Sequence, residues 1–340
     1  MRTSDFDYLL PPGLIAQRPA SPRDSSRLMI LHRDGAPLEH RSFRDLPEYV
    51  RPEDALVLNE TRVIPARLHA RKQPGGGRVE LLLLQRLEPQ VWETLVGGKG
   101  VRPGRKLIVD GGPAAEVLED LGGPRRVLRF AEPLSPQLER IGEMPLPPYI
   151  HAALQSPDEY QTVFARLPGS AAAPTAGLHF TPDLLQQVEA AGARLVRLAL
   201  HIGLDTFAPV NEDLVEDHLI HTEWCQLGAD AAAALQATRL AGGRILAVGT
   251  TSVRTLESAA SQAPPGRVVA AYEGPTDLYI LPGHKFRAVD ALLTNFHLPR
   301  STLLMLVSAF AGRERILEAY ETAIAQAYRF YSFGDAMLIT

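Results

Sequence analysis

The sequence predicts an α/β catalytic domain that carries an inserted small all-β, barrel-like domain. Residues 71–150 consist of short β-rich runs separated by glycine and proline turns, whereas strand and helix patterns alternate after residue 150. A further apolar strand at residues 55–58 precedes the β-rich region and leads into the polar stretch Asn59-Glu60-Thr61-Arg62. We therefore expect a discontinuous catalytic domain of residues 1–70 and 151–340, interrupted by the barrel-like domain at residues 71–150.

The inserted domain is predicted from its short strands and frequent turns. We expect strands at residues 79–84, 91–96, 106–109, 115–118 and 126–130. Turn-forming stretches such as Gly75-Gly76-Gly77 and Asp110-Gly111-Gly112-Pro113 separate them. This spacing is typical of a small barrel. The prolines of Pro145-Leu146-Pro147-Pro148 exclude a helix where the domain ends.

The catalytic domain is predicted from alternating helices and strands. We expect helices at residues 182–191, 230–241, 253–260 and 313–328, and strands at residues 194–200 and 244–248. The second of these strands runs through Gly249-Thr250-Thr251-Ser252 into a helix, so the three hydroxyls could cap that helix.

Composition limits the class of protein and its compartment. A chain of 340 residues with 45% hydrophobic content can bury a large core, which excludes a disordered protein. Its one cysteine, Cys225, excludes a disulfide framework and favours a reducing compartment. The longest apolar run, residues 303–312, is about half of the ~20 residues that a membrane-spanning helix needs, and the first residues are acidic rather than signal-like. We expect a cytoplasmic protein without a membrane partner.

Charge is unevenly distributed along the chain. Residues 59–107 contain ten Lys or Arg and four Glu, whereas the rest of the chain contains 25 basic and 35 acidic residues. The overall net charge of −4 therefore hides a basic region that could bind a polyanion. The alternative is a solvated face of a small domain, and charge alone does not decide between the two.

Two histidine-containing segments are candidates for proton transfer. Pro174-Thr175-Ala176-Gly177-Leu178-His179-Phe180 brings a hydroxyl, a glycine and an imidazole within five residues. Glycine lets a ligand approach the backbone, and histidine transfers protons near neutral pH. His201 follows the predicted strand 194–200, where α/β domains place their ligand groups. A helix-entry loop and a turn, each with a structural histidine, are the alternatives.

Two further segments could bind a ligand. The amides of Gly249-Thr250-Thr251-Ser252 could bind an anion, although a capped helix without a ligand is the default interpretation. Arg254 and Glu257 share one face of the following helix, an arrangement also typical of a surface ion pair. In Thr294-Asn295-Phe296-His297, polar side chains flank an aromatic ring and could hold a heterocycle.

A metal site is the main alternative within the sequence. His218 and His221 are three apart and Glu223 follows, which could place two imidazoles on one face of a helix. The His-Glu-x-x-His pattern is absent, so we expect hydrogen bonding or substrate contact rather than metal binding. The chain also lacks a Gly-x-Gly-x-x-Gly fingerprint and a phosphate-binding loop of the NTPase type, which disfavours a dinucleotide-binding enzyme and an ordinary methyltransferase.

Taken in order, these segments resemble the S-adenosylmethionine:tRNA ribosyltransferase-isomerase family of queuosine biosynthesis. The resemblance extends over almost the whole chain and rests on Asp5-Phe6-Asp7-Tyr8, Leu58-Asn59-Glu60-Thr61-Arg62-Val63-Ile64-Pro65-Ala66-Arg67, Ala173-Pro174-Thr175-Ala176-Gly177-Leu178-His179-Phe180, Gly249-Thr250-Thr251-Ser252-Val253-Arg254-Thr255-Leu256-Glu257, Thr294-Asn295-Phe296-His297-Leu298-Pro299 and Gly334-Asp335-Ala336-Met337. Each motif is weak alone, but their common order and spacing are specific.

The resemblance implies a reaction and its participants. The enzyme would move the ribosyl part of S-adenosylmethionine onto 7-aminomethyl-7-deazaguanine at the wobble position of tRNA, giving epoxyqueuosine in tRNA, adenine and methionine. S-adenosylmethionine is then a co-substrate, and neither a metal nor an organic cofactor is expected. We expect a monomer. A metal-dependent hydrolase that uses His218, His221 and Glu223 and a non-enzymatic RNA-binding regulator are the alternatives.

The same resemblance implies roles for individual residues. His179 and His201 are the candidates for proton transfer. The candidates for substrate binding are Thr175, Gly177, Thr250, Thr251, Arg254, Glu257, Asn295 and His297. Those for binding tRNA phosphates are Arg62, Arg67, Lys99, Arg102 and Arg105.

One position departs from the family pattern. Where the family has Gly-x-Gly-Thr-Phe, this chain has Gly203-Leu204-Asp205-Thr206-Phe207. Asp tolerates positive φ better than most residues, so a turn could survive this change. A close approach of the backbone to a ligand at Asp205 is what the change calls into question.

Overall fold

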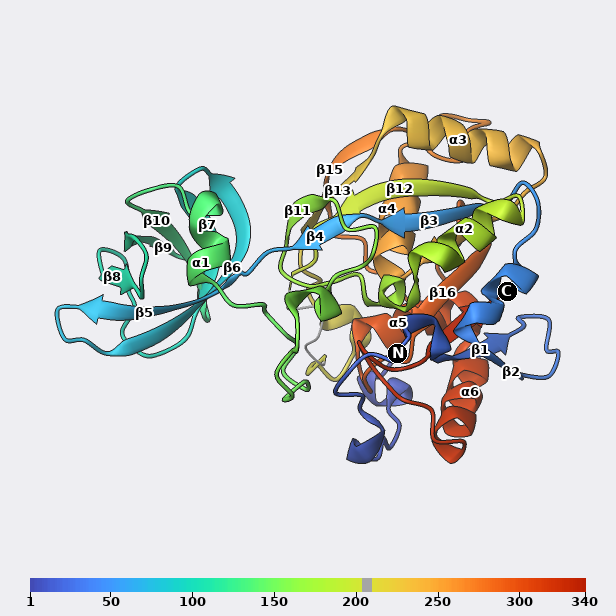
Figure 1. Ribbon diagram of the computed structural model, residues 1–340, viewed down its shortest axis with the longest axis horizontal. Coiled ribbons are helices and arrows are strands. Elements are labelled where there is room, and N and C mark those ends of the chain that lie inside the picture. The colour runs from blue at the N-terminus through green and yellow to red at the C-terminus, as the bar shows by residue number, and fades with distance from the viewer. Residues whose placement is uncertain (204–209) are drawn as a thin grey trace.

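The computed structural model describes residues 1–203 and 210–340, and shows a large α/β domain beside a smaller barrel (Figure 1). The sheet of the α/β domain has the order β15-β13-β12-β3-β14-β16-β17-β1-β2. These strands are β15 (Tyr272–Thr276), β13 (Glu223–Leu227), β12 (Arg194–Leu200), β3 (Ala55–Asn59), β14 (Ile245–Val248), β16 (Ala291–Asn295), β17 (Ala336–Ile339), β1 (Arg27–Leu31) and β2 (Glu39–Ser42). The predicted α/β fold class is confirmed.

The central strands are buried on both faces, as their continuous apolar sequences require. Successive residues of β3 point to opposite sides of the sheet. Val57 packs with the helices α3 (Ala229–Leu240), α4 (Thr250–Ser261), α5 (Thr302–Ala311) and α6 (Arg313–Ala325). Leu56 and Leu58 pack on the other face with α2 (Pro182–Ala190). The sheet therefore lies between two apolar layers, and polar residues lie at the ends of its strands.

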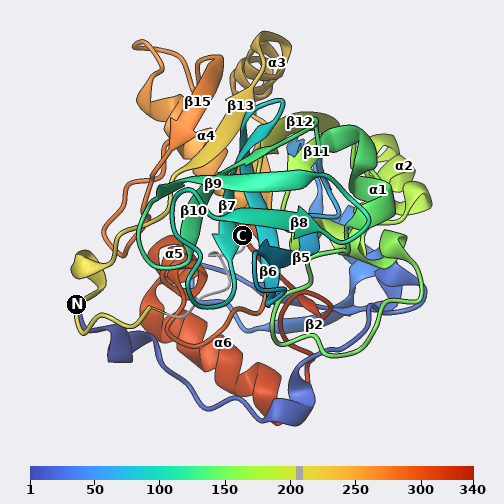
Figure 2. The ribbon, with the colours of Figure 1, turned by 90° about the vertical axis from the view of Figure 1, so that its left-hand side faces the viewer.

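The smaller domain is a closed antiparallel barrel, seen from its own side in Figure 2. Its strands are β5 (Arg67–Gln73), β6 (Arg78–Glu88), β7 (Val91–Val96), β8 (Lys106–Val109), β9 (Ala114–Asp120) and β10 (Arg125–Phe130), with the short helix α1 (Leu138–Ile141) following. Its core is separate and contains Leu68, Leu81, Leu107 and Leu128. The predicted inserted barrel is confirmed, while the limits at residues 70/71 and 150/151 stay predictions.

A short two-stranded sheet lies where the chain passes from one domain to the other. β4 (Thr61–Val63) follows β3 directly and pairs with β11 (Leu167–Ser170), which lies beyond the barrel in the sequence. The chain therefore enters and leaves the barrel side by side. Among residues 1–203 and 210–340, no helix is long and apolar enough to cross a membrane.

Several predicted elements differ from the structure at their ends. Helix α4 begins at Thr250, because Gly249 is its N-cap and adopts a φ of +83°, which favours glycine. The expected capping by the hydroxyls of residues 250–252 is wrong, since no side chain caps this helix and Ser252 donates back to the carbonyl of Val248 (2.7 Å). Helix α6 ends at Ala325, three residues earlier than predicted.

Candidate active site

Four of the polar segments meet at one edge of the sheet. β12, β3, β14 and β16 are parallel neighbours, so their carboxyl ends lie side by side. His201 follows β12, Asn59 ends β3, Thr250 follows β14 and Asn295 ends β16. Because α/β sheets bind ligands outside the carboxyl ends of their strands, this edge is the candidate site.

Asn59 joins three of these strand ends. Its Oδ1 accepts from the amide of Leu200 (3.1 Å). Its Nδ2 donates to the carbonyl of Leu200 (3.0 Å) and to Oγ1 of Thr251 (3.3 Å). The buried amide thus holds the end of β12 and the first turn of α4 against β3.

The segment of residues 170–180 crosses the same edge. The amide of Ala171 donates to the carbonyl of Ile202 (3.0 Å), and the hydroxyl of Thr175 donates to Oδ1 of Asn295 (3.0 Å). Gly177 is buried in the same segment, and a Cβ there would lie 2.6 Å from Cζ of Phe164. Packing against Phe164 is thus a reason for glycine at this position.

His179 lies at the centre of a buried hydrogen-bonded chain. Its Nε2 accepts from the side-chain Nδ2 of Asn295 (3.0 Å), so Nδ1 carries the proton and donates to Oγ of Ser26 (2.8 Å). The ring also stacks on Phe43, with centroids 4.8 Å apart. Burial, reinforced by Arg329 and Arg23, lowers the pKa of His179 to about 3. The imidazole is therefore neutral at physiological pH and fixes the orientation of the Asn295 amide.

His297 lies in a different environment from His179. Its Nε2 is 2.8 Å from Oγ1 of Thr294, and its amide donates to the hydroxyl of Tyr320 (2.8 Å). The hydroxyl of Tyr8 donates to its carbonyl. Burial lowers its pKa to about 3, so this imidazole is also neutral. The contacts of His297 anchor the end of β16 to an aromatic cluster.

Arg254 and Glu257 of α4 are both buried, and each has partners on other elements. Arg254 pairs with Glu223 and donates to the carbonyls of Leu278 (3.1 Å) and Thr276 (3.2 Å). Glu257 accepts from the amides of residues 287, 288 and 289 at 2.9 to 3.2 Å. The alternative of a surface ion pair between the two is therefore wrong.

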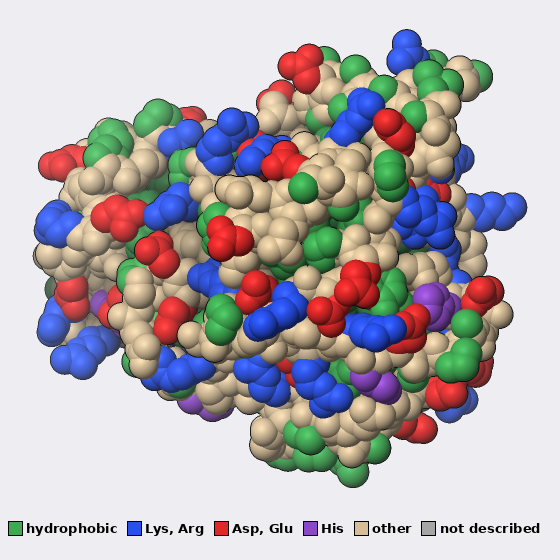
Figure 3. Space-filling model, turned by 45° about the vertical axis from the view of Figure 1, so that its right-hand side comes forward, with side chains coloured by type: hydrophobic (Ala, Val, Ile, Leu, Met, Phe, Trp, Pro, Cys, Tyr) green, Lys and Arg blue, Asp and Glu red, His purple; other side chains and the backbone are tan. Residues whose placement is uncertain are grey.

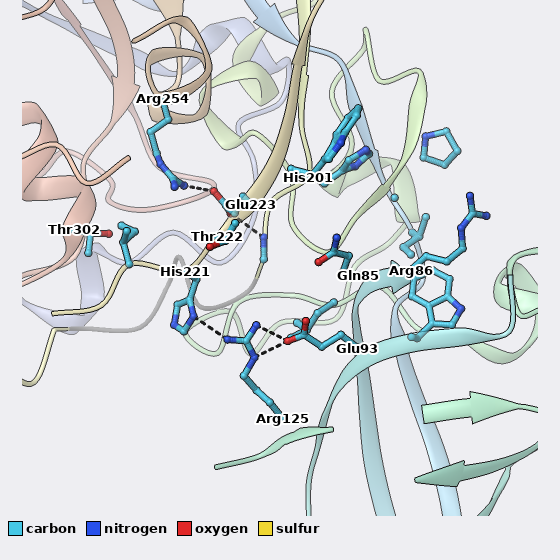
Figure 4. A pocket seen from close by; sticks show the side chains of 18 of the residues that line it. Gln85, Arg86, Glu93, Arg125, His201, His221, Thr222, Glu223, Arg254 and Thr302 are labelled. Carbon is cyan, nitrogen blue, oxygen red and sulfur yellow. Dashed lines mark hydrogen bonds and ion pairs between the residues drawn. The ribbon is translucent and has the colours of Figure 1, made fainter. Parts of the chain in front are cut away.

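A cleft of about 570 Å³ lies between the barrel and the α/β domain (Figure 4). We call it the interdomain cleft. Residues of the α/β domain that line it include Gly169, His201, Glu223, Trp224, Arg254 and Tyr279. Residues of the barrel that line it include Gln85, Arg86, Trp92, Glu93 and Arg125. Its volume is in the range typical of small-molecule sites.

A polar bridge crosses the interdomain cleft. Arg125 of β10 pairs with Glu93 of β7 and donates from Nη1 to Nδ1 of His221 (3.3 Å) in the α/β domain, as Figure 4 shows. The two walls of the cleft are thus in direct contact through one guanidinium.

The predicted site residues divide between the cleft and the rest of the sheet edge. His201 and Arg254 line the cleft. Thr175, His179 and Asn295 form one hydrogen-bonded group at the end of β16, and His297 contacts Thr294 instead. The structure thus brings the predicted residues to one edge of the sheet, but the two predicted proton-transfer histidines have different surroundings.

His201 differs from His179 in having a ring nitrogen that is not engaged. Its Nδ1 is buried and has no hydrogen-bond partner within the described ranges. Its ring lies beside that of Trp224, with centroids 5.2 Å apart and planes 30° apart. Burial lowers its pKa, so the neutral form is favoured.

The residues of the metal-site alternative line the cleft but are engaged separately. Nδ1 of His218 is 2.9 Å from Oε2 of Glu212, His221 contacts Arg125, and Glu223 pairs with Arg254. In the part of the chain that the structure describes, no three His, Cys, Asp or Glu side chains form a group that could hold a metal ion. The geometry therefore gives no support to a metal-dependent hydrolase.

The predicted tRNA-binding residues lie on the linker and the barrel. Arg62 is exposed on β4, whereas Arg67 is partly buried and lies 3.9 Å from Glu80. Lys99, Arg102 and Arg105 lie between β7 and β8, and we call these three the basic segment. On the face shown in Figure 3, Lys and Arg side chains are interspersed with Asp and Glu, so charge alone does not mark a phosphate-binding surface there.

Sequence reasoning missed several residues of the site. Ser26, Gly169 and Trp224 carry no recognisable motif, and the barrel wall of the cleft is known only once the domains are placed. Asn59 had a signal, since it ends an apolar strand within a segment that carries the family resemblance. Asp205, the departure from the family pattern, lies outside the described residues.

Comparisons with known proteins agree over the whole chain. A family model described as queuosine biosynthesis protein matches residues 3–339. The S-adenosylmethionine:tRNA ribosyltransferase-isomerase of Symbiobacterium thermophilum is 54% identical, and that of Rubrobacter xylanophilus is 53% identical, with 100% of this chain and 100% and 98% of the relatives covered. The crystal structure of an S-adenosylmethionine tRNA ribosyltransferase from Thermotoga maritima is 43% identical over 99% of this chain and 100% of that one, with a TM-score of 0.58.

Proposed function

The chain belongs to the queuosine biosynthesis protein family, and from that premise we propose that it transfers and isomerises the ribosyl moiety of S-adenosylmethionine on tRNA. The observation that carries the proposal is the full-length identity of about half to relatives that bear this activity in their names. The arrangement of the site supports it, because the segments that distinguish the family meet at the carboxyl edge of the sheet.

The proposed acceptor is 7-aminomethyl-7-deazaguanine at the wobble position of tRNA. The products are then epoxyqueuosine in tRNA, adenine and methionine. The proposal includes no metal and no organic cofactor, and it describes a monomer that acts in the cytoplasm.

The proposed reaction starts from the acidity that a sulfonium gives to its neighbouring hydrogens. A base removes a proton from C5′ of the ribose, and the electron pair left at C5′ breaks the bond between C4′ and the ring oxygen. That oxygen forms a carbonyl at C1′ as the bond to adenine breaks, and adenine takes up a proton. The amine of the tRNA base then attacks the activated sugar, and closure of the epoxide expels methionine. Such a sequence requires a positioned base, a proton donor and a site that excludes water.

We assign the role of base to His201. It lines the interdomain cleft, and burial lowers its pKa so that the neutral, proton-accepting form prevails. His179, the other predicted proton-transfer group, has both nitrogens engaged. Its proposed role is to hold Asn295, which together with Thr175 would contact the nucleobase or the ribose.

The remaining assignments follow from the position of each residue. Thr250 and Thr251 lie at the N-terminus of α4, where a carboxylate such as that of methionine is favoured. Arg254 and Glu257 act on that end of the substrate through the elements that they hold in place. Arg62, Arg67 and the basic segment are the proposed contacts to tRNA phosphates.

Release of adenine from S-adenosylmethionine tests the proposed function. We expect adenine in amounts equal to the modified tRNA, and none when the tRNA carries guanine in place of the aminomethyl base. His201→Ala should lower kcat by about 10²–10⁴-fold, the usual contribution of a proton-transfer side chain. Adenine release that does not depend on tRNA would contradict the proposal, as would full activity of the His201→Ala variant.

A further inference from the structure

The imidazole of His201 has two close neighbours at the interdomain cleft. One is the indole of Trp224, whose ring centroid is 5.2 Å away. The other is Gly169, where a Cβ would lie 2.9 Å from Cε1 and 3.1 Å from Nδ1 of the ring. Real Cβ atoms essentially never approach another atom to less than 3.0 Å. The ring therefore occupies the space that a side chain at position 169 would need.

The backbone conformation and hydrogen bonds around Gly169 hold β11 next to His201. Gly169 has a φ of +136°, a conformation that side chains rarely adopt. It lies at an irregularity in the pairing of β11 with β4, between Pro168 and Ser170, as is common for glycine in a bulge. Hydrogen bonds from the amide of Ile202 to Oγ of Ser170 (2.9 Å) and from Ala171 to the carbonyl of Ile202 (3.0 Å) fix β11 beside His201.

Trp224 is held in register with His201 by the backbone as well. The amide of His201 donates to the carbonyl of Trp224 (3.0 Å), directly after the paired residues Leu200 and Cys225 of β12 and β13. Trp224 is thus attached to the backbone of His201, and β11 is attached to that of the adjacent Ile202.

We propose that Gly169 is a positioning residue for the reaction, because its missing side chain allows His201 to present its imidazole to the cleft. This inference rests on the proposed function, in which His201 is the base. It adds a residue that acts only through His201 and does not itself touch the substrate.

The alternative is that glycine at position 169 has only a structural role. Glycine at position 169 would then be required only because its φ is positive, and replacement would strain the backbone whether or not a histidine is present. The two causes separate in a double-mutant cycle with His201→Ala, because that change removes the ring and leaves the φ requirement intact.

The cycle consists of wild type, Gly169→Ala, His201→Ala and the double variant. We expect Gly169→Ala to lower kcat by about 10²-fold, the effect of displacing a reacting group by about 1 Å. KM for S-adenosylmethionine should stay within about threefold, and Gly169→Ala should change kcat by less than about twofold in the His201→Ala background. Gly242→Ala is the control for backbone strain, since Gly242 has a φ of +80° and a Cβ there would meet nothing within 4 Å. It should keep the wild-type kcat.

Thermal unfolding of the same four proteins gives a second readout that does not depend on turnover. Gly169→Ala should lower Tm strongly in the wild-type background and much less in the His201→Ala background. If Gly169→Ala fails to fold alone, recovery of folding in the double variant supports the proposal that position 169 must lack a side chain because of the His201 ring. The proposal is overturned if Gly169→Ala keeps the wild-type kcat, or if its losses persist undiminished without the histidine. If wild type releases no adenine, the proposed function fails. The Tm values of the four proteins still decide whether Gly169 positions the ring of His201.

Discussion

Removal of the Glu223 carboxylate is predicted to destabilise the α/β domain more than any surface charge does. Arg254 and Glu223 have only 8% and 7% of their surfaces exposed, and they are paired on the wall of the interdomain cleft. Glu223→Ala leaves the guanidinium buried with the neutral carbonyls of Thr276 and Leu278 as its acceptors. Breaking one side of a buried pair costs about 3–5 kcal/mol, so we expect a loss of about that size.

Two further variants divide this loss into its parts. Glu223→Gln keeps an acceptor for the amide of Gly203 and for Arg254 but removes the charge. Since a charge-assisted hydrogen bond is roughly twice as strong as a neutral one, we expect a loss of about 1–1.5 kcal/mol. Glu318→Ala removes a carboxylate from an i,i+3 pair with Arg315, in which the Glu318 side chain is 61% exposed, and should cost less than about 0.5 kcal/mol.

Urea unfolding followed by the fluorescence of the two tryptophans measures these free energies of unfolding. The expected order of loss is Glu223→Ala, then Glu223→Gln, then Glu318→Ala. A loss for Glu223→Ala no larger than that for Glu318→Ala would contradict this prediction, because the buried pair would then contribute no more than an exposed one.

Three other predictions concern the buried histidines and the barrel. Ser26→Ala removes the acceptor of His179 Nδ1 and should cost about 1–3 kcal/mol in urea unfolding; a loss below about 0.5 kcal/mol would contradict the described hydrogen bond. Burial lowers the pKa of His179 and His297 to about 3 from 6.5, so the unfolded chain binds more protons between these values. The free energy of unfolding should therefore rise with pH from about 3 to 6.5, by up to about 1.4 kcal/mol per pH unit for each histidine, and then level off. His297→Asn should reduce that slope, and an unchanged slope would count against the assignment. Replacing any one residue of the basic segment by Ala should weaken tRNA binding and lower the slope of log Kd against log salt by about 1, with KM for S-adenosylmethionine unchanged. A salt slope equal to that of wild type would remove that residue from the tRNA contact.

The sequence predicted those strands and helices that are determined by neighbouring residues. The strands at residues 91–96, 106–109 and 194–200 have the bounds expected from their β-rich runs and flanking turns. β5 was not predicted, because only two of its seven residues, Leu68 and Ala70, are apolar. β17 and β1 pair in parallel although about 300 residues separate them, and no local pattern contains that information.

For the candidate site, the segments could be predicted from the sequence, but the partners of their residues could not. Spacing and collinearity selected the polar segments, and the parallel strands explain why those segments meet. The partners of the selected residues were not predictable, because they come from distant parts of the chain. Arg254 pairs with Glu223 rather than with its helical neighbour Glu257, and Gly169 lies against His201 through a bulge between β11 and β4.

In the proposed reaction, the ribosyl part of S-adenosylmethionine, and not its methyl group, is transferred to tRNA. The most direct measurement uses S-adenosylmethionine labelled in the ribose and, separately, in the methyl group, with tRNA that carries the aminomethyl base. We predict that the ribose label appears in tRNA in amounts equal to the adenine released, and that the methyl label leaves with methionine. Methyl label in tRNA, or ribose label that stays with the small molecules, would contradict the proposed function.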